Sequence, residues 1–322
     1  MRSFVFITSF LLLVSCLPED EGRVFNEQFG GAIAAVDIIG GKKDSSNSYP
    51  YVLSLNHCSG FIVAENLFVT AAHCVVKDNF NFSKRRVSLS NKVTPTSSSR
   101  KALNYRNIYK HKLYQNGGSI LADIAFIEIQ SSFSKIFSIK KIPRIFLPQL
   151  TQPPGTLFTK QNILAIGYGN VKERPREDTP SSSRRFVDLS LIKIFEEFKN
   201  TSGQWMLRRL SFDKLSRYFP QVITLSSYKK DTCRGDSGGP VMLRVNGNLF
   251  YLGSTVGGEK RCGKGKTAGY YRLVGTAICE VDKRVLELLQ IDQSVCDKKN
   301  ILSVFDLDFT VDEIEEIKMF KR

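Results

Sequence analysis

The chain has 322 residues, of which 42% are hydrophobic and 24% charged, an ordinary composition for a globular protein. Its 46 Lys and Arg residues against 31 Asp and Glu give a net charge of +15. A basic surface suits nucleic acid, anionic lipid or acidic protein. However, the basic residues are scattered and no nucleic-acid-binding motif occurs, so we expect no nucleic-acid partner and interpret the charge as a solvated, lysine-rich surface.

The first sixteen residues predict an export signal. Arg2 precedes an apolar run from Phe4 to Val14, which is too short to span a membrane as a helix. The ending Leu-Val-Ser-Cys resembles a bacterial lipobox, in which Cys16 is lipidated and tethers the chain to a membrane of the cell envelope. Plain secretion with an incidental cysteine is the alternative. Residues 17–37 are interpreted as a spacer or propeptide.

Six further cysteines follow, and an even number in an exported chain favours disulfides. They allow fifteen pairings from sequence alone. No C-x-x-C motif occurs and the chain has only three histidines, so we expect no metal site. Residues 77–96 hold too few acids for a calcium loop.

Short apolar segments rich in β-branched and aromatic residues predict many strands without alternating helices, the pattern of barrels or a sandwich. Asn246-Gly247, between two apolar runs, predicts a hairpin. The clearest strands are expected at 51–56, 58–64, 66–72, 123–130 and 162–169.

Helical spacing of apolar residues occurs at 204–219 and at 280–291. Near the end, Thr310 and Glu313 form a capping-box pattern. Residues 172–185 are polar and rich in Pro and Ser, so they predict a protease-sensitive loop. The tail 297–322 is either a packing helix or a contact surface for a partner.

Four motifs carry the chemistry, in this order along the chain: IIGG at 38–41, TAAHC at 70–74, DIAFI at 123–127 and DTCRGDSGGP at 231–240. Together they resemble the trypsin/chymotrypsin family of serine proteases, from Ile38 to about Leu289. The resemblance implies an all-β fold of two packed six-stranded antiparallel barrels with a C-terminal helix and a short extra tail. The peptidase domain would span 38–296, with barrels at about 38–150 and 151–280 and the helix at 280–291.

By resemblance, Ser237 is the nucleophile, His73 its general base, and Asp123 the carboxylate that fixes the histidine tautomer. A serine hydroxyl needs such a base because it is a weak nucleophile at neutral pH. The backbone N–H groups of Gly235 and Ser237 would form the oxyanion hole, and Gly238 would give the backbone freedom that the turn needs.

Asp231 lies six residues before the nucleophile, where trypsin-like members select Arg or Lys side chains. A buried carboxylate needs a cation, so discrimination against other side chains would be steep. Gly258 and Gly269 match the expected pocket walls, with Tyr271 beyond them. Compared with the family pattern, the register before Cys262 is one residue longer at Gly258.

The IIGG motif implies activation by cleavage before Ile38, whose freed α-amino group would pair with Asp236. An enzyme specific for Arg or Lys does not cut after Asp37, so we expect a separate activating protease. If Cys16 is lipidated, the same cut would release the catalytic part from the membrane.

The resemblance also implies the disulfides Cys58–Cys74 and Cys233–Cys262, which leaves Cys279–Cys296. We expect a monomeric hydrolase, free of cofactor and metal, that acts on protein or peptide substrates with Arg or Lys before the scissile bond. The alternative functions are a catalytically silent, protease-like binding module at the cell surface, and a basic surface adhesin.

Overall fold

The computed structural model describes residues 38–75, 80–111, 114, 122–147, 163–169, 183–199, 205–210, 222–226, 230–245, 247–258, 262 and 269–296. All of them belong to one unit, Ala35–Arg322. The lipobox at Cys16, the spacer, the capping box at Thr310 and the tail 297–322 lie outside the described residues, as do residues 172–182 of the polar loop.

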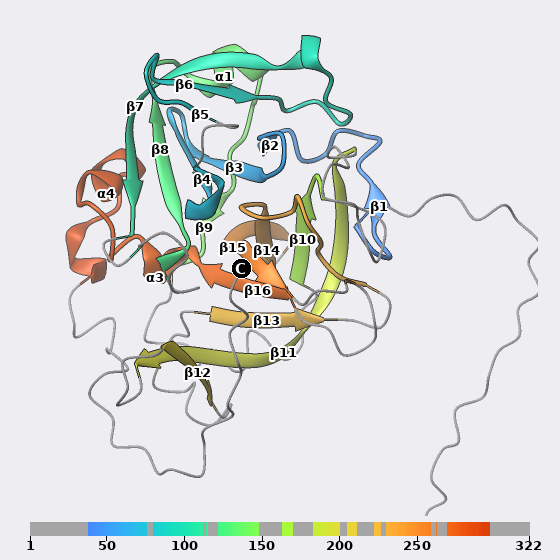
Figure 1. Cartoon of the computed structure of the whole chain (residues 1–322), viewed down its shortest axis with the longest axis vertical. Coiled ribbons are helices and arrows are strands. Elements are labelled where there is room, and N and C mark those ends of the chain that lie inside the picture. Colours follow the sequence, from blue (N-terminus) through green and yellow to red (C-terminus); the bar gives the residue numbers. More distant parts are fainter. Residues whose placement is uncertain are drawn as a thin grey trace, which may run out of the picture. The chain divides into compact units, whose positions relative to one another are not determined.

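The first sheet has seven strands in the order β2-β3-β4-β8-β7-β6-β5, drawn in blue to green in Figure 1. All pairings are antiparallel, and a bridge between Ser54 and Ser90 joins the ends of β2 and β6. This bridge closes six of the strands into a ring. The strands are β2 (Val52–Ser54), β3 (Ser59–Ala64), β4 (Leu67–Thr70), β5 (Phe80–Asn81), β6 (Arg86–Leu89), β7 (Lys101–Lys110) and β8 (Ala125–Ile129).

The second sheet follows the order β1-β11-β10-β14-β15-β16-β13, and β13 pairs with β11 as well as with β16. The six strands from β11 to β13 therefore also close on themselves. β12 extends β11, and β9 adds to β15 as a parallel partner. The strands are β1 (Lys42–Lys43), β9 (Arg144–Ile145), β10 (Ile163–Gly167), β11 (Arg185–Lys199), β12 (Trp205–Leu210), β13 (Val222–Ser226), β14 (Pro240–Val245), β15 (Asn248–Gly258) and β16 (Gly269–Leu273).

The predicted fold class is therefore confirmed, and the apolar runs explain it. All five residues of β8 and all five of β10 are buried, because both faces of these strands pack against apolar layers. The hairpin of β14 and β15 turns at Gly247, whose φ of 79° lies in the left-handed region. That conformation is the one an Asn-Gly turn supplies at low cost.

The helix predicted at 204–219 is wrong over its described part. Trp205–Leu210 is strand β12, paired antiparallel with Ile194–Lys199 of β11. The leucines fit helical spacing only approximately, and the hydrogen bonds to the neighbouring strand stabilise the extended conformation instead. Such a tertiary override is common where an apolar pattern fits the helical period only moderately.

Short helices complete the described part: η1 (Ala72–Cys74), η2 (Ser97–Ser99), α1 (Phe133–Phe137), α3 (Val274–Ala277), α4 (Arg284–Leu289) and η5 (Gln293–Cys296). The helix predicted at 280–291 is thus present as the shorter α4. Within the described residues, none of these helices has the length and apolar character needed to cross a membrane.

Candidate active site

His73 and Asp123 meet because their strands are neighbours. His73 lies on η1 just after β4, and Asp123 lies just before β8, while Thr70 pairs with Ala125 across the two strands. The Nδ1 atom of His73 is 2.6 Å from Oδ2 of Asp123, and the backbone N–H of His73 donates to Oδ1 at 2.8 Å. Asp123 is buried, so the imidazole and its carboxylate are held in one geometry.

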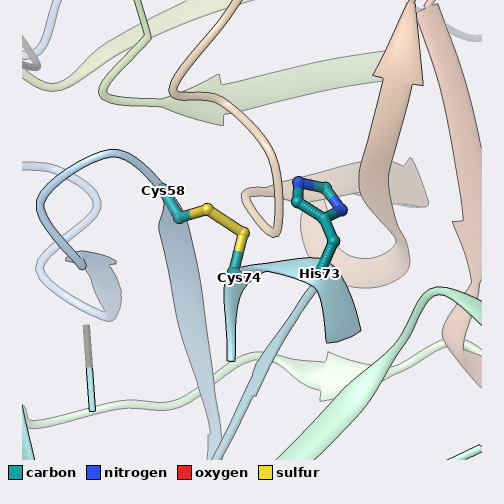
Figure 2. Close-up of side chains that lie close together, drawn as sticks. All are labelled: Cys58, His73 and Cys74. Carbon is teal, nitrogen blue, oxygen red and sulfur yellow. A yellow bond between two sulfur atoms is a disulfide. The ribbon is translucent and has the colours of Figure 1, made fainter. Parts of the chain in front are cut away.

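The disulfide Cys58–Cys74 braces the same turn. Figure 2 shows His73 and Cys74 side by side on η1, with the disulfide running from Cys74 to Cys58 on another segment. These three side chains bring one nitrogen and two sulfurs within 4.8 Å of each other. However, the sulfurs are bonded to each other, and metals in proteins bind thiolates. The cluster therefore has the chemistry of a brace, and it does not fit a metal ion.

Ser237 lies in the loop 231–239 that leads into β14. Its carbonyl oxygen accepts the N–H of Ser59 at 2.8 Å and lies 3.6 Å from Sγ of Cys74, so the loop contacts the turn that carries His73. Gly235 and Gly238 have φ values of 96° and 82°. A Cβ on Gly238 would lie 2.2 Å from Oγ1 of Thr70, so both conformation and space require glycine there.

Two backbone donors of this loop stand out. In the described part of the chain, the N–H groups of Asp236, Gly238 and Gly239 all donate to backbone carbonyls. No such acceptor is recorded there for the N–H groups of Gly235 and Ser237. This pattern leaves two donors of one tight turn available to an anionic oxygen.

Asp236 is fully buried between the loop and the end of β10. Its carboxylate accepts the N–H of Gly169 at 2.8 Å and the N–H of Cys233 at 2.8 Å. Burial raises the pKa of Asp236 to about 7, although the two backbone bonds act in the opposite direction and nearby Asp231 raises it further. A Cβ atom at position 167 or 169 would collide with this carboxylate, which explains why both positions are glycine.

Asp231 is buried at the start of the loop, and its N–H donates to the carbonyl of Ile39 at 3.1 Å. Gly258 and Gly269 are paired across β15 and β16. A Cβ on Gly269 would lie 2.4 Å from the hydroxyl of Tyr271. The two glycines therefore lie opposite each other, as pocket walls would, while residues 259–261 and 263–268 between them lie outside the described residues.

Ile38 is completely buried in the core of the second barrel, packed with Ile163, Val187 and Tyr271, among others. Its φ of 40° is unusual, because a β-branched side chain clashes with its own backbone in the left-handed region. This strain exists only while residue 37 is attached, since φ of Ile38 is defined by the bond to that residue. Asp37 itself lies outside the described residues.

The other two disulfides join Cys233 to Cys262 and Cys279 to Cys296. The first ties the loop of Ser237 to the segment that follows β15. The second joins the end of α3 to η5. The first is a pair that the sequence resemblance implied, and the second is the pair that was left over.

Sequence reasoning left several structural residues unassigned. His111 is buried, and its Nε2 lies 2.7 Å from Oε2 of Glu280. Arg272 also pairs with Glu280. Burial by itself raises the pKa of Glu280, but Arg272 and His111 outweigh it and hold that pKa below its ordinary value. This cluster ties the strand ends near Asp123 to the C-terminal helices.

A second buried pair joins Asp44, shortly after Ile38, to the distant Arg184. Arg184 and Asp44 are both buried, with their side chains 2.8 Å apart, and Arg184 also donates to the hydroxyl of Tyr168 at 3.1 Å. No motif marks these residues in the sequence. Only their contact in the fold identifies them as the anchor of the chain that follows the IIGG segment.

The fold and these contacts define a two-barrel β protein with a histidine–carboxylate pair facing a glycine-rich serine loop. The family model described as trypsin matches residues 38–278. The chain belongs to the trypsin family.

Two curated relatives are similar over most of this chain. A CLIP domain-containing serine protease B4 of Anopheles gambiae is 23% identical over 254 residues, which cover 73% of this chain and 66% of the relative. Complement factor I of Rattus norvegicus is 24% identical over 248 residues, which cover 74% of this chain and 37% of the relative. The chain thus spans less than two thirds of each relative's length.

Proposed function

We propose that this chain is a serine endopeptidase that cleaves after Arg or Lys and is made as an inactive precursor. The observation that carries the proposal is the His73–Asp123 bond at the ends of two paired strands, beside the serine loop of the other barrel. Membership in the trypsin family and the name of the mosquito relative agree with a hydrolase.

Ser237 would attack the scissile carbonyl as His73 takes its proton, and Asp123 would stabilise the imidazolium that forms. The bond from the backbone N–H of His73 to Asp123 supports this assignment, because it fixes the carboxylate from the side away from the ring. His73 would then give the proton to the leaving amine. A water molecule would release the acyl group by the same route in reverse.

The N–H groups of Gly235 and Ser237 would bind the oxyanion of the tetrahedral intermediate. Within the described residues, neither N–H donates to a backbone carbonyl, and this supports the role. Preorganised donors cost no rearrangement during the reaction, and the loss of one typically lowers turnover by about 10²- to 10³-fold.

Asp231 would bind the cationic side chain of the substrate, between Gly258 and Gly269. Its burial supports this role, because a buried carboxylate favours a cationic partner over a neutral one. Gly258 and Gly269 add no side chains of their own to these walls, and the hydroxyl of Tyr271 lies beside Gly269. We expect a preference for Arg and Lys over Phe or Ala of about 10⁴-fold in kcat/KM.

Activation would follow cleavage before Ile38. The freed ammonium group would pair with Asp236, and the cut would also remove the backbone strain at Ile38, a term of about 1–3 kcal/mol. Because Asp37 precedes the bond and the proposed specificity is for Arg or Lys, a separate protease would make the cut.

Export of the chain is part of the proposal, supported by the apolar run at the N-terminus and by three disulfides. The curated relatives named above are animal proteins, and nothing in them supports a bacterial lipoprotein. Lipidation of Cys16 therefore stays a prediction. The intact mass of the mature N-terminus tests it, because an acylated cysteine adds hundreds of daltons.

Hydrolysis of chromogenic peptides ending in Arg, Lys, Phe or Ala tests the function directly. The full precursor would carry an enteropeptidase site in place of residues 33–37, so that a defined cut frees Ile38. We expect cleavage after Arg and Lys that appears only after the cut. Ser237→Ala is the matched control for contaminating activity, and Asp231→Ser should abolish the preference while leaving the protein folded.

The competing function is a binding module without activity. A folded protein with a free Ile38 that cleaves none of the peptides would favour it. Activity after Phe alone would instead keep the triad and overturn only the role of Asp231.

A further inference from the structure

Ser59 contacts the serine loop from the opposite barrel. It is the first residue of β3, directly after Cys58, and its exposed fraction is 0%. Its N–H donates to the carbonyl of Ser237 at 2.8 Å. Its own carbonyl accepts the hydroxyl of Thr70 at 2.8 Å. The backbone of Ser59 is thus fixed on both sides, which leaves its side chain to explain.

The hydroxyl of Ser59 joins two segments of the second barrel. Oγ accepts the N–H of Tyr168 at 3.0 Å and donates to the carbonyl of Gly235 at 2.8 Å. A backbone N–H only donates, so the single hydroxyl proton is left for the carbonyl. The direction of both bonds is therefore determined, and the chain of bonds runs from Tyr168 through Ser59 to Gly235.

Tyr168 is a firm support for this chain of bonds. It is completely buried, and its ring hydroxyl lies within hydrogen-bonding distance of the carbonyls of Val52, at 3.2 Å, and Lys92, at 3.0 Å. The next residue, Gly169, donates to Asp236. Two successive backbone N–H groups after β10 thus hold the loop, one directly and one through the hydroxyl of Ser59.

Gly235 is the point in the loop that most needs such support. Its φ of 96° is open to glycine alone at low cost, and glycine has the greatest backbone freedom of all residues. Its N–H is one of the two donors proposed for the oxyanion. The position of that donor depends on where the peptide planes on either side of Gly235 lie, and the Ser59 bond fixes the plane that carries the Gly235 carbonyl.

We propose that Ser59 is a positioning residue of the oxyanion hole: by holding the Gly235–Asp236 peptide it fixes the place of Gly235, so that the Gly235 N–H, which belongs to the preceding peptide, points at the developing negative charge. The inference rests on the proposed function. Ser59 does not touch substrate, so it acts only through Gly235. Its effect should therefore appear in interactions with tetrahedral species and not in ground-state binding of the cationic side chain.

The test compares Ser59→Ala with the wild-type enzyme, both prepared from the full precursor by the cut before Ile38. Two inhibitors are used. A peptidyl arginine aldehyde forms a tetrahedral adduct with Ser237 and uses the oxyanion hole, whereas benzamidine needs only the Asp231 site. We expect the aldehyde to bind about 10- to 100-fold more weakly and kcat to fall by a similar factor, less than for complete loss of a donor. Benzamidine binding and KM should change less than about twofold.

Ser90→Ala is the matched control. Ser90 is equally buried and also accepts a backbone N–H, that of Lys92 at 3.3 Å, but no bond to residues 231–239 is recorded for it among the described residues. We expect both variants to melt at lower temperature, and only Ser59→Ala to lose affinity for the aldehyde. The pH profile of kcat/KM should keep its shape, because the His73–Asp123 pair is untouched.

Equal weakening of both inhibitors, or an unchanged aldehyde affinity, would overturn the role of Ser59 while leaving the proposed function standing. A wild-type enzyme without turnover or inhibitor binding overturns both. If Ser59→Ala does not fold, Ser59→Gly leaves room for a water molecule to satisfy Tyr168. We expect Ser59→Gly to lose affinity for the aldehyde but not for benzamidine. Equal affinities to those of the wild type would count against the proposal.

Discussion

His73 and Asp123 are fixed by the barrel that carries them, whereas residues 231–239 are fixed by segments far away in the chain. The first pair sits at the ends of β4 and β8, with a backbone bond and a disulfide on the same turn. The loop instead donates the N–H of Asp231 to the carbonyl of Ile39, and it accepts bonds at Ser237 from Ser59 and at Asp236 from Gly169.

Under the proposed function, this difference would place the control of activity in the loop 231–239. Once the first barrel has folded, the base and its carboxylate are in place. The proposed oxyanion donors and Asp231 depend on several remote contacts, and one of them involves the residue next to Ile38. A cut before Ile38 would therefore act on the half of the site that is assembled from remote parts.

The largest effect on activity should come from removing the key side chain of either half of the site, His73 in the first barrel or Ser237 in the loop. We expect Ser237→Ala and His73→Ala each to lower kcat by about 10⁶-fold, and the double variant to lower it no further, because the two groups act as one unit. Burst titration with an active-site reagent and steady-state rates on an arginine peptide measure this. A single variant that keeps more than about 1% of kcat would contradict the assigned roles.

The half that the first barrel holds can be broken more selectively. Asp123→Asn keeps one oxygen for the backbone N–H of His73 but presents an amide to the ring, which favours the wrong tautomer. We expect kcat to fall by about 10⁴-fold, the loss that this change causes in well-studied serine proteases. Melting temperature and benzamidine binding should stay near wild type. A loss below tenfold would show that Asp123 is not the orienting carboxylate.

The stability of the folded protein should depend on pH through Asp236, in the remote half of the site, and this dependence should differ before and after the cut at Ile38. In the precursor, burial raises the pKa of Asp236 to about 7, so the folded state holds a proton that the unfolded chain releases near pH 4. Stability should therefore fall as pH rises from about 4 to about 7, by about 4 kcal/mol, and then level off. After the cut, an ammonium group on Ile38 would lower this pKa and remove the slope.

Urea unfolding of the Ser237→Ala protein at a series of pH values, before and after the cut, measures this difference. Groups common to both forms cancel in the difference between the two curves, which leaves Asp236 and the new α-amino group that would pair with it. Asp236→Asn is the control, and it should make the curves of the two forms parallel. Parallel curves in the protein that retains Asp236 would show that the α-amino group does not reach it.

Motifs predict a nucleophile, a base and glycines in the sequence because that chemistry has steric and proton-transfer needs that leave few alternatives. The structure brings His73 and Asp123 into contact and lays the loop of Ser237 against the same turn, while their catalytic roles stay predictions. Ser59, Tyr168 and Arg184 have no local signature, since their roles come from contacts more than 90 residues away in the chain. The strand at Trp205–Leu210 was missed for the same reason, because its partner β11 decides its conformation.

The smallest effect on activity should come from the disulfide Cys279–Cys296, which lies outside both halves of the site. It closes a loop with a sequence separation of 17, and the chain-entropy model gives about 3 kcal/mol for a loop near this length. Replacing both cysteines by Ala should lower the free energy of unfolding by about this amount and leave kcat/KM within about twofold. The same change at Cys233 and Cys262 should lower kcat/KM as well, because that bond holds the serine loop. Equal losses of activity in the two double variants would mean that the C-terminal helices support the loop directly, and that the remote half of the site extends further than its recorded bonds.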